Sequence, residues 1–189
     1  MNNARTAPDT RLMALASMHC REGAPGLGAD ELAAHAAALQ GWLCSSGRIE
    51  KAFRHFGHDI TCEDHVLEAG LGFAVDTTKA EFIGREAVLR KRDTGLDRRL
   101  LQFRLNDPEP LLYHNEPILR DGVIVGQLSS GAYGHHLGGA MGMGYVPCKG
   151  QNADEVLASS YAIDVAGRIV PVTASLRPMY DPGNERMKA

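Results

Sequence analysis

The order of hydrophobic and polar positions predicts a loose leader and a helix at the start of the chain. Residues 1–28 are rich in alanine, glycine, proline and polar residues without a sustained period. The alanine and leucine content of residues 29–42 favours a helix, with Asp30 as its N-cap and Gly41 as its stop. Residues 47–60 fit a strand or a short helix by period, so the pattern leaves that segment open.

Two further elements are predicted before the chain becomes strand-rich. An apolar strand is expected around residues 71–75, where the acidic stretch before it ends. Residues 84–91 contain good helix formers and an apolar face at Ala87 and Val88, which predicts a helix. A turn at residues 93–95 is expected to end that helix.

The rest of the chain has the pattern of short strands separated by turn signals. The predicted strands are 99–105, 117–119, 123–128, 161–165 and 169–176. Asp121-Gly122 and Ala166-Gly167 are hairpin signals between two pairs of these strands. The many glycines of residues 131–144 indicate a tightly curved strand with close backbone approach. This pattern predicts an antiparallel barrel or sandwich.

Composition and charge are those of an ordinary globular domain. The chain has 189 residues, of which 44% are hydrophobic and 23% charged. Its formal net charge of −3 gives no electrostatic reason to propose nucleic acid or an anionic membrane as a partner. No apolar run reaches the about 18–20 residues that a membrane helix needs. The short, broken apolar stretch at residues 12–18 is a poor signal peptide, so we expect a cytoplasmic protein.

Cysteines and histidines form no recognisable metal-site pattern. The four cysteines include no CxxC pair, which favours buried or incidental thiols over zinc ligands or disulfides. His55 and His58 are close in sequence and His135 and His136 are adjacent, but neither pair argues for a metal site. The sequence shows no nucleophile or orienting acid beside His135 and His136, so we expect a surface role for them.

Five stretches of the sequence resemble, in order and spacing, segments of the glycine-cleavage T-protein (aminomethyltransferase) family. They are GRIEKAFRHFGHDI, LEAGLGFAV, EFIGREAVL, GQLSSGAYGHHLGGAMGMGYV and RIVPVTASLRPMYDP. Two local variants, IEKAFRHFGHDI and LLYHNEPI with SGAYGHHLGGA, are more similar to the folate domains of dimethylglycine and sarcosine dehydrogenases. The resemblance covers residues 45–183 and points to the C-terminal part of the family's fold.

The resemblance implies an α+β fold, in which a partial α/β subdomain is followed by an antiparallel Greek-key-like β-barrel. The implied parts are a leader with a helix at 1–46, part of the middle T-protein subdomain at 47–97, the barrel at 98–183 and a tail at 184–189. The family's first subdomain, whose aspartate is placed to assist one-carbon transfer, has no counterpart here. No G-x-G-x-x-G opens a flavin-binding unit either. We therefore assign no catalytic residue and expect no flavin in this chain.

The resemblance also implies four residues that contact a folate. Glu50 occupies the place of the family's R-x-E carboxylate, which accepts hydrogen bonds from the pteridine ring. Phe56 stands where many relatives have a tyrosine beside the ring. Lys79 and Tyr113 lie at or next to positions where some T-proteins have an arginine, and Tyr113 is expected to bond the folate tail. The plainer interpretations are a solvated charge for Glu50, core packing for Phe56 and a cap of the barrel edge for Tyr113.

These observations lead to three hypotheses for function. The first is a tetrahydrofolate-binding module of one-carbon metabolism, from a protein resembling dimethylglycine or sarcosine dehydrogenase. The second is an aminomethyltransferase that acts on a lipoyl-bound intermediate, and the third is a non-catalytic fragment or partner-binding domain. With the first subdomain missing, the face that carries Glu50 and Tyr113 is expected to be covered. The candidate covers are a second copy of the chain, the 29–42 helix or a flavin-containing partner subunit.

Overall fold

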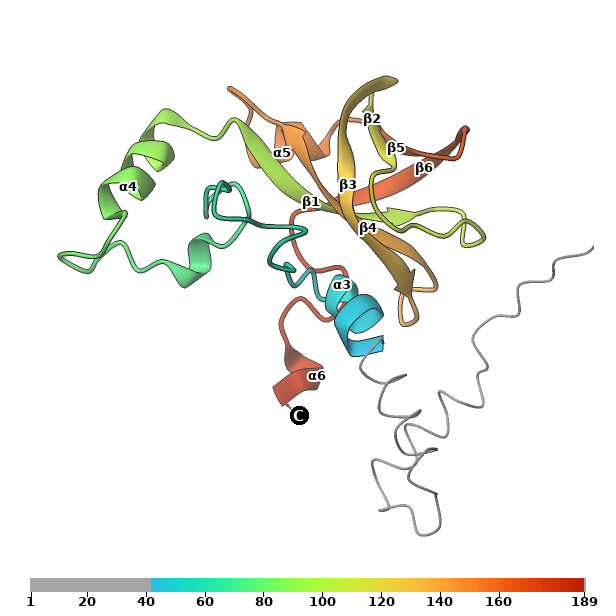
Figure 1. Ribbon diagram of the computed structural model, residues 1–189, viewed down its shortest axis with the longest axis horizontal. Coiled ribbons are helices and arrows are strands. Elements are labelled where there is room, and N and C mark those ends of the chain that lie inside the picture. The colour runs from blue at the N-terminus through green and yellow to red at the C-terminus, as the bar shows by residue number, and fades with distance from the viewer. Residues whose placement is uncertain (1–41, 189) are drawn as a thin grey trace, which may run out of the picture. The chain divides into compact units, whose positions relative to one another are not determined.

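Six antiparallel strands form a closed barrel (Figure 1). The computed structural model describes residues 42–188. The strands are β1 (Arg98–Leu105), β2 (Pro117–Arg120), β3 (Val123–Gly134), β4 (Gly139–Pro147), β5 (Tyr161–Val165) and β6 (Arg168–Ser175). Their order around the barrel is β1-β4-β3-β2-β5-β6, and every neighbouring pair is antiparallel. The predicted α+β fold with an antiparallel barrel is confirmed.

The connections between strands make a Greek key. Hairpins join β2, β3 and β4 in sequence, while β1 lies beside β4 and reaches β2 only through residues 106–116. Both predicted hairpin turns are present. Asp121 and Gly122 have φ of 51° and 83°. Ala166 and Gly167 have φ of 54° and 87°. Positive φ at both central residues suits two-residue hairpins, because this turn matches the twist of the strands that it joins.

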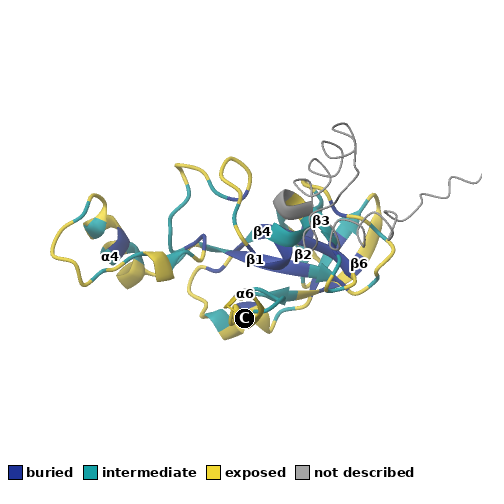
Figure 2. Cartoon of the chain, turned by 90° about the horizontal axis from the view of Figure 1, so that it is seen from below, coloured by how far each residue is buried: buried dark blue, intermediate teal, exposed yellow. Residues whose placement is uncertain are grey.

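The barrel has hydrophobic clusters on both sides of β1 and β4. The inner cluster includes Leu101, Phe103, Leu105, Leu112, Ile118, Leu128, Val146 and Ile163. The outer cluster consists of Ile49, Ala52, Leu100, Met141 and Met143. Successive side chains of a strand point to opposite faces, so two covered faces explain why consecutive residues of these strands are buried. Figure 2 shows this burial on β1 and β4, in contrast to the exposed loops around α4.

The glycines of β4 make room for inner side chains. A Cβ at Gly142 would lie 2.6 Å from Leu128 Cδ1, and one at Gly144 would lie 2.5 Å from Ile118 Cδ1. Both distances are well inside van der Waals contact. The glycine-rich stretch therefore serves close packing, as the sequence pattern indicated. The expectation of a curved strand over residues 131–144 is wrong, because residues 135–138 form the turn between β3 and β4.

Helices are short and lie mostly before the barrel. They are the π-helix η1 (Trp42–Gly47), α3 (Arg48–Glu50), the 3-10 helix η2 (Gly72–Ala74), α4 (Arg85–Thr94), α5 (Ala153–Leu157) and α6 (Glu185–Lys188). The helix predicted over 84–91 is confirmed and continues to Thr94. Gly84 and Gly95 flank it with φ of 87° and 88°, values that glycine adopts without strain.

The strand predicted around residues 71–75 is wrong. This segment forms η2, and the side chain of Phe73 is 85% exposed. A strand needs a neighbour to satisfy its backbone groups, and no strand of the described residues lies beside this one. For residues 47–60 the sequence pattern fitted either a strand or a short helix. The structure has the short helix α3 there, followed by an isolated bridge between Phe56 and Ile60.

The helix α5 was not predicted, although a sequence motif marks its start. Asn152 accepts a hydrogen bond from the backbone N–H of Glu155, whose side chain accepts one in return from the N–H of Asn152. This capping box marks the start of α5. The helix predicted over 29–42 lies outside the described residues, except for Trp42.

A carboxylate cluster fixes the segment before the barrel to the start of β1. Glu68 is buried and accepts hydrogen bonds from Arg98 Nε (3.1 Å) and the backbone N–H of Asp97 (3.1 Å), and it pairs with Lys91 Nζ (2.9 Å). Lys91 also pairs with the Asp97 carboxylate. Burial alone would raise the pKa of Glu68, but the hydrogen bonds from Lys91, Asp97 and Arg98 outweigh it and hold the pKa below its ordinary value of 4.5.

This cluster predicts acid sensitivity. The folded pKa of Glu68 lies below the unfolded one, so its stabilisation is complete above the unfolded pKa and is lost as the pH falls through the folded value. We expect the free energy of unfolding to fall less between pH 6 and pH 3 in Glu68→Gln than in the unchanged protein. Urea titrations across this range check it, with the exposed Glu63→Gln as control. Equal pH dependence in all three proteins would contradict the assignment.

Candidate functional site

Glu50 ends α3 and lies against the turn between β3 and β4. Only 1% of its surface is exposed. Its Oε1 accepts hydrogen bonds from the backbone N–H groups of His136 (2.6 Å) and Leu137 (3.2 Å), and its Oε2 lies 2.7 Å from His136 Nδ1. A Cβ at Gly134 would lie 3.2 Å from Oε1, so the glycine lets the carboxylate approach the strand. The carboxylate is therefore buried, and both of its oxygens have hydrogen-bond partners.

His136 has the orienting acid that the sequence analysis did not find. The ring lies at the surface, as expected, but the expectation that no acid lies beside it is wrong, because Glu50, 86 positions away, bonds the ring. The His136 ring also stacks on Tyr180, with ring centroids 4.3 Å apart and planes 27° from parallel. A carboxylate can only accept, so Nδ1 of the neutral imidazole carries the proton. The pair orients the ring in both position and tautomer.

A buried amide holds these distant segments together. Gln102 Nε2 donates to the carbonyl oxygens of Ile49 (2.6 Å) and Glu50 (3.2 Å), and its Oε1 accepts from the backbone N–H of Met179 (2.8 Å). The backbone N–H of Tyr180 donates to the Glu50 carbonyl oxygen (3.3 Å). The outer face of β1 thus positions both Glu50 and Tyr180.

The four residues that the sequence predicts as folate contacts do not meet in one place. Phe56 and Tyr113 are 65% and 60% exposed, and Lys79 is exposed beside α4, where its carbonyl oxygen accepts from Arg85 Nε (2.9 Å). No side-chain hydrogen bond joins Glu50 to any of the other three within the described residues.

The strand β3 separates Tyr113 from Glu50. A Cβ at Gly131 would meet the Tyr113 backbone at 2.6 Å, whereas a Cβ at Gly134 would meet Glu50. Positions three apart on a strand point to opposite faces, so the backbone of Tyr113 and the side chain of Glu50 lie on opposite sides of β3.

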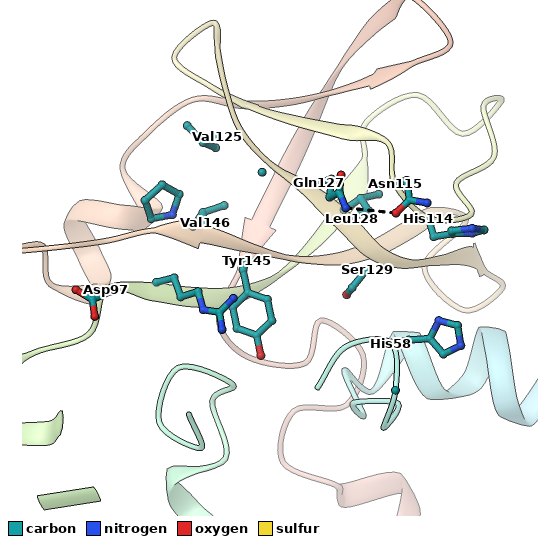
Figure 3. A pocket seen from close by; sticks show the side chains of 14 residues that line it. His58, Asp97, His114, Asn115, Val125, Gln127, Leu128, Ser129, Tyr145 and Val146 are labelled. Carbon is teal, nitrogen blue, oxygen red and sulfur yellow. Dashed lines mark hydrogen bonds between the residues drawn. The ribbon is translucent and has the colours of Figure 1, made fainter. Parts of the chain in front are cut away.

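A pocket is lined by residues that follow Phe56 and Tyr113 in the sequence (Figure 3). Its volume is about 660 Å³, within the range of small-molecule sites. Gly57 and His58, which follow Phe56, line it together with His114 and Asn115, which follow Tyr113. Parts of β3 and β4, with Asp97 and Arg98 at the start of β1, complete the lining. Figure 3 shows Asp97 and His114 at opposite ends, so the pocket is elongated.

Tyr145 lines the pocket, and its hydroxyl oxygen is buried. This oxygen has no hydrogen-bond partner among the described residues, and the ring lies 4.5 Å below the Arg98 guanidinium. Burial, with a further contribution from Asp64, raises the pKa of Tyr145 to about 12. Beside it, the Ser129 hydroxyl donates to Asp59 Oδ1 (2.6 Å), and Asp59 is paired with Arg48 (2.7 Å).

Comparison with known families decides what this barrel is. Residues 98–181 match the family model described as the glycine cleavage T-protein C-terminal barrel domain. The barrel belongs to the glycine cleavage T-protein family. A solved aminomethyltransferase T of the glycine cleavage system from Bartonella henselae has the same fold, with a TM-score of 0.63 and 24% identity. The similarity covers 73% of this chain and 38% of that one.

Sequence relatives of this T-protein barrel include oxidases or dehydrogenases on the one hand and aminomethyltransferases on the other. The 4-methylaminobutanoate oxidase (formaldehyde-forming) of Paenarthrobacter nicotinovorans is 38% identical over 142 residues, which cover 75% of this chain and 17% of the relative. Human mitochondrial sarcosine dehydrogenase is 35% identical, over 74% of this chain and 16% of its own length. The aminomethyltransferase of Halothermothrix orenii is 40% identical over 52% of this chain and 28% of its own length. The chain thus spans about a sixth to a quarter of these relatives.

The described residues of the T-protein barrel and its neighbouring segments show neither a metal site nor an activated thiol. Within residues 42–188, no group of three or more His, Cys, Asp or Glu side chains could hold a metal ion. Burial raises the pKa of the Cys148 thiol, whose Sγ contacts the Leu96 carbonyl oxygen (3.4 Å). A thiol in this state is a poor nucleophile. No helix in the described part of the chain is long and apolar enough to cross a membrane.

Proposed function

We propose that this chain is a tetrahydrofolate-binding module from a protein that resembles N-methyl amine dehydrogenases and oxidases. One observation carries the proposal. The 142-residue match to 4-methylaminobutanoate oxidase is longer than the barrel at 98–181, so it takes in residues outside the barrel. The aminomethyltransferase of Halothermothrix orenii is 40% identical over 99 residues. The aminomethyltransferase of Nostoc sp. matches over a similar length of 139 residues, but its identity is 32% against 38% for the oxidase. We therefore base the proposed function on the N-methyl amine enzymes rather than on the aminomethyltransferases.

The chemistry of such a module is capture of a one-carbon unit. The Paenarthrobacter relative is named as formaldehyde-forming. A folate nitrogen is a nucleophile that adds to formaldehyde or to the corresponding imine, and a protein aids this step mainly by holding the reactants together. No residue of this chain is assigned a catalytic role.

The contact proposed with most support is Glu50. Phe56, Lys79 and Tyr113 are further contacts carried over from the family resemblance, although they do not lie beside Glu50 in this structure. Glu50 is supported by its surroundings, since a buried carboxylate with an attached imidazole is an organised polar site. Support for Phe56 and Tyr113 comes from the pocket that their neighbours line. Lys79 has no comparable support in the geometry.

Calorimetric titration with tetrahydrofolate tests the proposal. We expect saturable binding by the full chain and binding about ten-fold weaker in Glu50→Gln, a loss of ~1.4 kcal/mol. Gln has the same size, so backbone contacts to residues 136 and 137 are kept. The exposed Glu109→Gln is the matched control and should bind like the unchanged protein. Absence of binding by the unchanged chain would refute the proposal and favour a non-catalytic partner-binding domain.

The second candidate is an aminomethyltransferase, favoured by the match to the Halothermothrix enzyme and by the fold of the Bartonella one. It differs in its second reactant, which is an aminomethyl group carried on a lipoyl protein. Release of ammonia from such a carrier in the presence of tetrahydrofolate would support this candidate over the first.

We further propose that the segment before the barrel is covered in the working protein. Phe53, Phe56, Phe73 and Ile83 are exposed there, and a run of exposed large apolar side chains marks an interaction surface. The covers considered are a second copy of the chain and a flavin-containing partner subunit. Light scattering of the purified chain separates them, because a dimer mass supports the first, and a monomer that gains mass only with a flavin-containing partner supports the second.

A further inference from the structure

We infer that Arg104 binds a carboxylate of the ligand on the same face of the barrel as Glu50, and that in tetrahydrofolate this carboxylate belongs to the glutamate tail. This inference rests on the proposed folate function and deepens it. Glu50 keeps the contact proposed for it. Arg104 adds a second contact of opposite charge, which the family resemblance did not supply.

The guanidinium of Arg104 has no partner within residues 42–188. It forms no hydrogen bond or ion pair there, and its Nε is buried without an acceptor. Two other arginines of the barrel strands, Arg98 and Arg168, each pair with a carboxylate. Buried donors without acceptors are uncommon in folded proteins, and one explanation is a group that binds there. Arg104 therefore keeps its capacity to bind an anion.

The side chain of Arg104 is held at its base and accessible at its end. Arg104 lies opposite Met141 of β4, which belongs to the outer cluster, and residues opposite each other on paired strands share a face. Its Nε is buried, whereas its two terminal nitrogens are not. These two nitrogens form a planar fork that matches the two oxygens of a carboxylate. An anchored fork loses little freedom when an anion binds, which favours affinity.

A pair of glycines places Arg104 near Glu50. Gly134 and Gly139 are direct partners on β3 and β4, so their Cβ positions would lie on one face, about 5 Å apart. A Cβ at Gly134 would lie 3.2 Å from Glu50 Oε1, and one at Gly139 would lie 3.6 Å from Arg104 Nε. These two side-chain atoms are therefore within about 12 Å of each other. They form no ion pair, so Glu50 does not occupy the fork of Arg104.

The two charges together select a ligand that has both a donor edge and a negative group. A pterin ring supplies the donor edge proposed for Glu50, but the ring alone is uncharged at neutral pH. Tetrahydrofolate adds carboxylates on a flexible glutamate tail. A carboxylate accepts two charge-assisted hydrogen bonds from a guanidinium, so the tail is the part of this ligand that fits Arg104.

Calorimetric titrations of the full chain with two ligands test the inference. One ligand is tetrahydrofolate, and the other is 6-methyltetrahydropterin, which has the pterin ring but no glutamate tail. We expect Arg104→Gln to bind tetrahydrofolate about ten-fold more weakly and to bind the tailless pterin like the unchanged protein. Equal binding of the tailless pterin also shows that the variant folds and that its Glu50 contact is intact.

Arg90→Gln is the matched control. Arg90 is exposed on α4, which is not a barrel element, and the substitution removes the same charge. This variant should bind both ligands like the unchanged protein. The thermal midpoint of Arg104→Gln should equal that of Arg90→Gln, because Arg104 has no hydrogen bond to lose within the described residues.

A free anion is another source of the same chemistry, and titration with inorganic phosphate separates it from the tail. Phosphate binding that is lost in Arg104→Gln, with an undiminished affinity of that variant for tetrahydrofolate, would assign Arg104 to a free anion and overturn the inference.

The remaining outcomes separate the inference from the proposed function. If tetrahydrofolate binds the unchanged chain but Arg104→Gln binds it equally well, the inference fails and the proposed function stands. Equal weakening for tetrahydrofolate and the tailless pterin would also overturn the inference, because Arg104 would then not meet the tail. If the unchanged chain binds no tetrahydrofolate, both the inference and the proposed function are refuted.

Discussion

A Gln102→Leu variant is expected to lose about 2 kcal/mol of its free energy of unfolding, because a buried polar group left without a partner is costly. The substitution keeps the approximate volume but leaves the N–H of Met179 without the Gln102 acceptor. The carbonyl oxygens of Ile49 and Glu50 lose the Gln102 amide but keep the backbone N–H groups of Ala52 and Tyr180. Urea denaturation measures the loss.

The loss should be local as well as global. Gln102 is the residue that joins α3 and the C-terminal segment to the outer face of β1, so amide hydrogen exchange should accelerate first around residues 49–52 and 179–181. Gln127→Leu is the matched control, since Gln127 is exposed and its only side-chain hydrogen bond within residues 42–188, to Asn115, is 3.4 Å long. Equal destabilisation by both variants would mean that the Gln102 amide does not hold the site together.

A Gly131→Ala variant is expected to be destabilised by about 2–3 kcal/mol through overpacking. The added Cβ would lie 2.6 Å from the carbonyl carbon of Leu112 and from the backbone nitrogen of Tyr113. Backbone atoms cannot rotate away as the end of a side chain can, so either residues 112–113 or the strand β3 must shift. Thermal and urea denaturation measure the effect, and the loop shift should also change the pocket beside Asn115.

Gly183→Ala serves as the control for this prediction. A Cβ there would lie 3.5 Å from the Glu185 side chain, an ordinary contact. Gly183→Ala is therefore expected to leave stability within about 0.5 kcal/mol of the unchanged protein. A Gly131→Ala protein as stable as the Gly183→Ala protein would show that residues 112–113 can move without a loss in the free energy of unfolding.

The sequence by itself determined the elements that depend on neighbours along the chain. The hairpins at Asp121-Gly122 and Ala166-Gly167 follow from residues that accept positive φ. The helix α4 follows from good helix formers between two glycines. The antiparallel order follows from short strands joined by such turns. The resemblance of five ordered segments identified the family, and the match to residues 98–181 agrees with it.

Only the tertiary structure decided where the polar residues of the site meet. Glu50 and His136 are 86 positions apart, and the sequence contains no local pattern that pairs them. Burial on both faces of β1 also hid the alternation that would have shown Gln102 pointing at α3. The failed strand at 71–75 has the same cause, because a strand exists only with a partner and the described chain offers none there. Local conformation is encoded by neighbouring residues, whereas a binding site depends on contacts between distant segments, which form only when the barrel closes.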